Sequence, residues 1–216
     1  MRIDVNKMHM ATGVTLIDTN STYTDKNVKI GRDTIIYPNC HIKGNSVIGE
    51  DCIIRENTTI EDSHIEDHVT IKSSTILSSK VGARTTIGPY AYLRPKSVLG
   101  EDVKIGDFVE VKNAEIGNGS KASHLSYIGD AVVGKNVNIG CGVVFVNYDG
   151  KNKFKSIVED NAFIGSNSNL VAPVTVKEGG YIATGSTVTV DVPEGALCVA
   201  RAREVIKEGW RTKKGL

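Results

Sequence analysis

Aliphatic residues recur along most of this chain at intervals of six residues. Unbroken sets of such positions run from Ile30 to Ile60 and from Val158 to Val188, and the sets between them restart after steps of four or five residues. A period of six matches neither an α-helix nor a simply alternating strand. It is typical of a coil with three flat sides, in which each side turns one aliphatic residue inward.

Glycine, asparagine and aspartate occur beside many of these aliphatic positions, as at Gly49, Gly100 and Asn118. These residue types favour turns because they tolerate a positive φ. Three hexapeptides make one coil, and coils stack at the strand spacing of about 4.8 Å. The pattern predicts an all-β fold, a hexapeptide-repeat parallel β-helix shaped as a triangular prism, with roughly nine coils over residues 28–191.

Three segments lie outside the repeat. Residues 1–27 are interpreted as an N-terminal connector, with a short helix over 6–11 that ends before Gly13. Residues 147–156 interrupt the repeat and are expected to form a loop expelled from the prism. Residues 192–216 are interpreted as a C-terminal basic arm with a second short helix over 202–208.

Composition agrees with this architecture and excludes several classes of protein. Aromatic residues are only 6% of the 216 residues, and a stacked aliphatic column needs few of them. The net charge of +1 argues against a general nucleic-acid binder. No apolar run is long enough for membrane insertion, and the first residues lack a signal core, so a cytoplasmic protein is expected. The cysteines show no metal-ligand spacing, which favours reduced thiols: Cys40, Cys52, Cys141 and Cys198.

Positive charge is concentrated in two places. Residues 201–216 contain six basic and two acidic residues, a net charge of +4, and Lys151, Lys153 and Lys155 lie close together in the expelled loop. Both clusters fit a solvated surface, and both also fit contact with an anionic ligand such as a phosphate.

Arg94 and Lys112 are 18 residues apart with no change of phase between them. They are therefore expected to stack about 5 Å apart on one face of the prism, pointing outward. Two stacked cations repel each other unless an anion lies between them, and arginine can grip a sugar phosphate with two hydrogen bonds. A phosphate site and an ordinary solvated stripe are both compatible with this geometry.

Several motifs resemble one family of hexapeptide-repeat enzymes. In chain order they are Leu93-Arg94-Pro95, Phe108-Val109-Glu110-Val111-Lys112, Lys121-Ala122-Ser123-His124-Leu125-Ser126-Tyr127, Val137-Asn138-Ile139-Gly140, Asn147-Tyr148-Asp149-Gly150-Lys151-Asn152-Lys153, Leu170-Val171-Ala172-Pro173-Val174 and Lys207-Glu208-Gly209-Trp210-Arg211. Together they resemble the acetyltransferase part of the bacterial bifunctional glucosamine-1-phosphate N-acetyltransferase / N-acetylglucosamine-1-phosphate uridyltransferase. The resemblance covers nearly the whole chain and implies a left-handed β-helix.

The resemblance implies acetyl transfer from acetyl-CoA to the amine of glucosamine 1-phosphate, in the UDP-N-acetylglucosamine pathway of cell-wall biogenesis. The amine would attack directly, with His124 as the general base. Glu110 is considered as a group that orients the imidazole. No metal is needed for this reaction, and the family forms homotrimers with active sites between subunits, so the loop and the arm are expected to reach a neighbouring subunit.

The same resemblance implies the binding residues. Sugar-phosphate contacts are implied at Arg94, Lys112, Tyr127, Asn138 and Lys153. Acetyl-CoA contacts are implied at Cys141, Asn147, Tyr148, Ser166, Thr184 and Arg201. Cys141 and Thr184 stand where the family commonly has alanine, so their backbone is expected to make the contact. The Cys141 N–H is the implied oxyanion donor, while its side chain is expected to serve only as a small apolar group.

Family members carry a nucleotidyltransferase domain before this part, and no segment here resembles its glycine-rich phosphate loop. The chain is therefore expected to lack uridylyl transfer, either as a truncated piece or as a free-standing acetyltransferase. Three alternatives stay open: a hexapeptide acyltransferase with another acceptor or donor, a metal enzyme like the γ-class carbonic anhydrases, and a non-catalytic β-helix scaffold.

Overall fold

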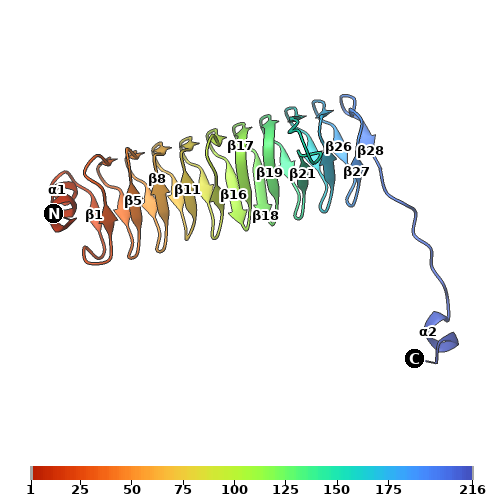
Figure 1. Ribbon diagram of the computed structural model, residues 1–216, viewed down its shortest axis with the longest axis horizontal. Coiled ribbons are helices and arrows are strands. Elements are labelled where there is room, and N and C mark those ends of the chain that lie inside the picture. The colour runs from red at the N-terminus through yellow and green to blue at the C-terminus, as the bar shows by residue number, and fades with distance from the viewer. Residues whose placement is uncertain (1, 216) are drawn as a thin grey trace.

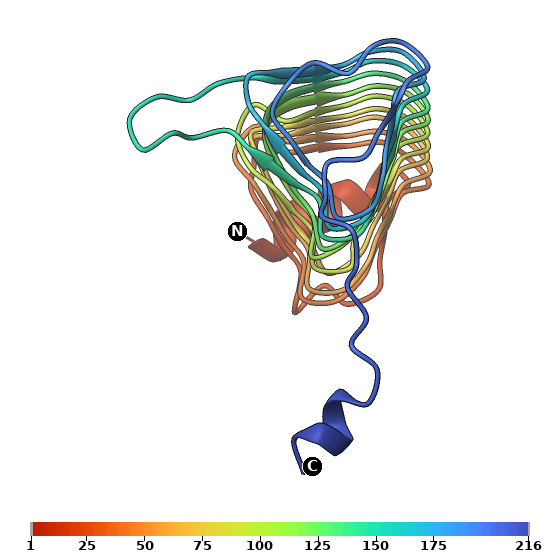
Figure 2. The same ribbon diagram turned by 90° about the vertical axis from the view of Figure 1, so that its right-hand side faces the viewer.

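The computed structural model describes residues 2–215, which form a long stack of coils followed by an extended C-terminal segment (Figure 1). Viewed along the stack, the coils superimpose as a triangle, and one loop projects well outside its outline (Figure 2). All strand pairings between named strands are parallel. The predicted parallel β-helix is confirmed.

Each side of the triangle is a ladder of short strands, which we call the first, second and third faces in chain order. The first face is the 11-stranded sheet of β1 (Thr15–Leu16), β4 (Ile35–Ile36), β7 (Ile53–Ile54), β10 (Thr70–Ile71), β13 (Thr86–Ile87), β16 (Lys104–Asp107), β18 (Lys121–His124), β20 (Asn138–Ile139), β23 (Phe163–Ile164), β26 (Tyr181–Ile182) and β28 (Leu197–Cys198). The second face contains β2 (Tyr23–Thr24), β5 (His41–Lys43), β8 (Thr59–Glu61), β11 (Thr75–Leu77), β14 (Tyr92–Leu93), β21 (Val144–Val146), β24 (Asn169–Val171) and β27 (Thr187–Val188). The third face contains β3 (Lys29–Ile30), β6 (Val47–Ile48), β9 (His64–Ile65), β12 (Lys80–Val81), β15 (Val98–Leu99), β22 (Ser156–Val158) and β25 (Val174–Val176). Two longer strands, β17 (Glu110–Ile116) and β19 (Tyr127–Val133), run from the second face around a corner onto the third.

The core is the predicted column of aliphatic side chains. One coil shows the rule: Ile36, Ile42 and Ile48 come from the three faces and are at most 1% exposed. The six-residue period predicts Leu77 as the inward residue of β11, and this prediction is wrong. Ile76 is the fully buried residue there, whereas Leu77 beside it is half-buried. Two successive five-residue steps occur there, so the register cannot be read from the period alone.

The stack extends beyond residues 28–191 at both ends. β1 and β2 pair with β4 and β5, so regular coils begin near residue 14 rather than 28. Helix α1 (Arg2–Ala11) covers this end, where the buried Asn6 amide donates to the carbonyls of Thr19 and Thr22. At the other end β28 still pairs with β26. The arm contains helix α2 at Trp210–Lys213, and residues 202–208 are not helical, contrary to expectation.

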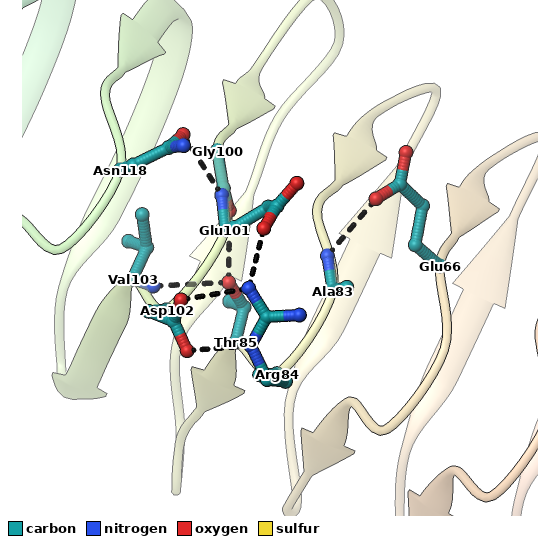
Figure 3. Close-up of polar contacts among 9 residues, drawn as sticks. All are labelled: Glu66, Ala83, Arg84, Thr85, Gly100, Glu101, Asp102, Val103 and Asn118. Carbon is teal, nitrogen blue, oxygen red and sulfur yellow. Dashed lines mark hydrogen bonds and ion pairs between the residues drawn. The ribbon is translucent and has the colours of Figure 1, made fainter.

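Polar groups close the corner between the third and first faces, as Figure 3 shows for four adjacent coils. The buried Thr85 hydroxyl donates to the Gly100 carbonyl (2.9 Å) and accepts from the Val103 N–H (3.1 Å) of the next coil. On the surface, the Arg84 guanidinium binds the carboxylates of Asp102 and Glu101. These contacts fix the vertical alignment of the coils, which in turn fixes which outward residues stack.

Candidate functional site

The corner between the first and second faces carries a vertical row of residues in successive coils, which we call the His124 corner: Asp107, His124, Cys141, Ser166 and Thr184. Strand register aligns them, since Asp107 faces His124 directly and Ile139, Ile164 and Ile182 pair in sequence. Each residue of the row is the second one after a buried aliphatic or alanine side chain. The prism therefore brings together positions that are up to one third of the chain apart.

His124 contacts a carboxylate of the preceding coil. Its Nδ1 atom lies 2.6 Å from Asp107 Oδ1, and the His124 side chain is 59% exposed. The hydrogen bond with His124 lowers the pKa of Asp107 below its ordinary value, so the carboxyl group is ionised and can only accept. Nδ1 must then carry the proton of a neutral imidazole, which leaves the Nε2 lone pair free.

Asp107, and not Glu110, is the carboxylate that contacts His124. The Glu110 carboxylate instead accepts a hydrogen bond from Arg94 Nη1 at 2.9 Å. Sequence reasoning missed Asp107, although the coil length offered a signal: Asp107 stands 17 residues before His124, one coil with a five-residue step.

The backbone of the His124 corner has free donors. Within residues 2–215, the N–H groups of Cys141, Ser166 and Thr184 have no hydrogen-bond partner. At the corner between the third and first faces the corresponding N–H groups are taken, for example that of Glu101 by Asn118 and that of Lys135 by Asp160. A row of unpaired, partly exposed donors suits a ligand with several carbonyl or phosphate oxygens.

A second group of predicted residues surrounds a cavity of about 350 Å³ at the far edge of the second face, here called the lysine cavity. Its lining includes Arg94, Lys96, Lys112, Asn113, Asp130 and Lys153. Arg94 and Lys112 lie in successive coils as predicted, because Leu93 pairs with Val111. The anions beside them are carboxylates of this chain, with Lys112 Nζ lying 3.7 Å from Asp130 Oδ2.

Lys153 reaches the lysine cavity from the expelled loop. The loop is the segment that projects from the triangle in Figure 2, and an antiparallel bridge between Tyr148 and Lys153 closes its base. A hydrogen bond that Lys112 donates to the neutral Lys153 amine, together with the like charge of Lys112, lowers the pKa of Lys153. The loop therefore delivers a second ammonium group beside Lys112.

The remaining predicted residues do not gather at one point of the chain. Tyr127 lies on the second face between the two sites and accepts a long hydrogen bond from Asn147 (3.4 Å). Asn138 lies on the first face, on the other side of the His124 corner. Tyr148 stands at the loop base, whereas Arg201 follows β28 at the end of the stack beside Gly185. One chain thus distributes the implied ligand contacts over two faces and two corners.

Among the described residues, no group of three or more His, Cys, Asp or Glu side chains is arranged to hold a metal ion. Neither of the two described helices is long and apolar enough to cross a membrane.

Known proteins match this chain over its whole length. The chain is 72% identical over 214 residues to "Bifunctional protein GlmU" of Clostridioides difficile (strain 630), a match that covers 99% of this chain and 47% of that protein. It is 67% identical over 216 residues to the GlmU protein of Alkaliphilus oremlandii (strain OhILAs), covering 100% of this chain and 48% of that protein. The chain therefore spans about half the length of these relatives.

Two further matches concern the architecture. A family model described as the EIF2B subunit epsilon LbH domain matches residues 6–111. The solved structure of Francisella novicida UDP-N-acetylglucosamine acyltransferase superimposes with a TM-score of 0.59 at 18% identity, covering 86% of this chain and 67% of that chain. At that identity the likeness concerns the fold alone. Because the sequence matches run from end to end at high identity, this chain corresponds over its whole length to one part of the GlmU proteins.

Proposed function

We propose that this chain transfers an acetyl group from acetyl-CoA to the amine of glucosamine 1-phosphate, as a step in UDP-N-acetylglucosamine synthesis. The observation that carries the proposal is the Asp107–His124 contact of 2.6 Å on an exposed corner. It stands beside backbone donors that are unpaired within the described chain. A base next to oxyanion donors is what acyl transfer to an amine requires.

His124 Nε2 removes a proton from the ammonium group of the sugar, and Asp107 stabilises the imidazolium that forms. The amine lone pair then attacks the thioester carbonyl carbon and forms the N–C bond. The Cys141 N–H donates to the oxyanion. When the carbonyl re-forms, the C–S bond breaks and the CoA thiolate leaves, taking up the proton that His124 holds. The attacking nitrogen gives up its second proton to solvent, which leaves the neutral amide. No covalent enzyme intermediate is needed, because a neutral amine is already a good nucleophile.

The sugar phosphate binds the lysine cavity, where Arg94, Lys112 and Lys153 converge. Acetyl-CoA lies along the His124 corner, where backbone N–H groups of Cys141, Ser166 and Thr184 stand in successive coils. Arg201 meets the cofactor phosphates. The side-chain N–H groups of Asn147 already bind Asp130 and Tyr127. They are therefore not free to donate to acetyl-CoA, and Asn147 serves the site by its place at the start of the loop.

The active enzyme is a homotrimer with its sites between subunits. The support is the distribution of residues over the prism, since Tyr127 lies on the second face and Asn138 on the first face of one chain. Two prisms packed side by side bring different faces together.

The test measures CoA release from acetyl-CoA with glucosamine 1-phosphate, glucosamine or glucosamine 6-phosphate as acceptor. We expect release with the 1-phosphate only, and a fall of about 10²–10⁴-fold in kcat for His124→Ala, the range that a general base supplies. Release with another acceptor would favour a different hexapeptide acyltransferase, and no release from a trimeric protein would favour the non-catalytic scaffold.

A further inference from the structure

Asp130 is a buried carboxylate that none of the sequence motifs singled out. It stands in β19, directly after the position that faces Lys112, and is 9% exposed. The amides of Asn113 and Asn147 both donate to it, one from the preceding coil and one from the following coil. The result is a three-residue ladder that crosses successive coils at the edge of the lysine cavity.

The ladder joins two parts of the proposed site. Asn147 is the first residue of the expelled loop, so its bond to Asp130 anchors the loop at its root. Lys112 Nζ lies 3.7 Å from the same carboxylate, and both side chains are largely shielded from solvent, at 20% and 12% exposure. Asp130 is therefore placed to influence both lysines of the cavity.

The charges around Asp130 show the direction of that influence. Burial would raise the pKa of Asp130, but the hydrogen bonds from Asn113 and Asn147 and the charges of Lys112 and Lys153 outweigh it, and the pKa is lowered. Conversely, the hydrogen bond and charge of Lys112 together with partial desolvation lower the pKa of Lys153, while Asp130 and Tyr127 act to raise it. Arg94 and Lys96 add two further cations to the cavity lining.

We infer that Asp130 is a positioning residue that keeps Lys112 and Lys153 charged side by side as a clamp for the phosphate, and that ties this clamp to the loop root through Asn147. Without a carboxylate between them, two adjacent ammonium groups lower each other's affinity for protons. Lys153 would then lose its proton at a lower pH than in the wild-type protein, and the clamp would lose one charge. The role in phosphate binding rests on the proposed function, which supplies the identity of the ligand. The coupling of the two lysines to Asp130 does not depend on catalysis.

The first experiment measures the lysines themselves. Trace acetylation with isotope-labelled acetic anhydride over a range of pH, read by mass spectrometry, gives the pH midpoint for each ε-amine. In Asp130→Asn the midpoint of Lys153 should fall, because the charge of Asp130 acts to raise it. Lys29, which lies in β3 far from the cavity, is the internal reference.

Asp160→Asn is the matched control. Asp160 also accepts a hydrogen bond from an adjacent coil, here from the Lys135 backbone N–H, but it lies at the corner between the third and first faces, away from Lys112 and Lys153. Its variant should leave the Lys153 midpoint unchanged. An unchanged midpoint in folded Asp130→Asn would overturn the inference. Should that variant not fold, Lys112→Gln tests the coupling between the two lysines. The Lys153 midpoint must then rise, and a constant midpoint overturns the clamp.

Kinetics then connect the clamp to substrate. In Asp130→Asn the KM for glucosamine 1-phosphate should rise about tenfold as pH increases past the lowered Lys153 midpoint, with a smaller change at acidic pH, because a protonated lysine binds phosphate better than a neutral one. A KM that rises equally at all pH values would indicate a structural defect and contradict the proposed role. If the wild type shows no acetyl transfer, the proposed function fails while the labelling result still decides the lysine coupling.

Discussion

At the scale of single residues, the His124 corner shows backbone strain beside its chemistry. Leu125 and Phe108, which follow His124 and Asp107, have φ angles of 45° and 55°. Equivalent positions in later coils are Gly142, Asn167 and Gly185, residue types that tolerate a positive φ. Large apolar residues are costly there. Tyr90 has a φ of 57° at the equivalent position of the preceding coil, so the strained backbone belongs to this corner over successive coils and not to the Asp107–His124 pair alone.

Asp107→Asn should lower kcat about tenfold or more, a part of the roughly 10²–10⁴-fold contribution of a general base, while changing the KM for glucosamine 1-phosphate little. The reason is that asparagine keeps the size of the side chain but no longer stabilises an imidazolium. Steady-state kinetics check this split. Glu115→Gln, which removes an exposed carboxylate on the third face, is the control and should retain full activity. Equal loss in kcat and affinity would argue against an orienting role.

At the scale of elements, strands of two or three residues depend on their corners for stability. Buried hydroxyls serve this purpose repeatedly: Thr34, Thr85 and Ser120 each donate to a carbonyl and accept an N–H from the next coil. A corner has no regular strand ladder, so its buried backbone groups need these side-chain partners. Coil alignment, and with it the His124 corner, rests on such contacts.

Thr85→Val should destabilise the protein by about 1–3 kcal/mol, because the Gly100 carbonyl and the Val103 N–H lose their partner. Figure 3 shows both bonds. Denaturant unfolding measures the change. Thr85→Ser keeps the hydroxyl and should cost clearly less than the valine variant. Valine matches threonine in shape. If the valine variant were as stable as the wild type, the hydroxyl bridge would contribute nothing to stability.

At the scale of the whole molecule, one prism carries the parts of a site without assembling them. The His124 corner and the lysine cavity lie at opposite edges of the second face, and the arm extends away from the stack (Figure 1). The arm also exposes large apolar side chains, with Val205 and Ile206 more than 80% exposed and Trp210 51% exposed. These features support contacts between copies of the chain.

If sites form between subunits, inactive variants should complement each other. His124→Ala and Arg201→Ala, each impaired alone, should regain about a quarter of wild-type activity when co-expressed, because random mixing in a cyclic trimer rebuilds that share of sites. The assay is CoA release from co-purified mixtures, with separately purified and unmixed variants as the control. Absence of any regained activity in verified mixed trimers would place both residues in the same subunit's site.

The amino-acid sequence determined the architecture of this protein. One inward aliphatic residue per hexapeptide can be satisfied only by a three-sided coil, and turn residues between them mark the corners. The same period placed Arg94 over Lys112, because an 18-residue separation without a phase change is one full coil. The motif resemblance selected His124, Lys153 and the other candidate residues, whose ligand contacts remain predictions.

Only the tertiary structure decided which side chains meet. Asp107 reaches His124, and Asp130 reaches Asn147, because coils with one five-residue step bring residues 17 positions apart into contact. Asp130 also reaches Lys112, which lies 18 positions before it. Glu110 was the expected partner of His124 but lies on the second face, where Arg94 binds it. Period and spacing fix the direction of a residue on the prism, whereas hydrogen bonds depend on ångström-scale offsets between coils, and these offsets are set by the packing and the corner contacts of the complete stack.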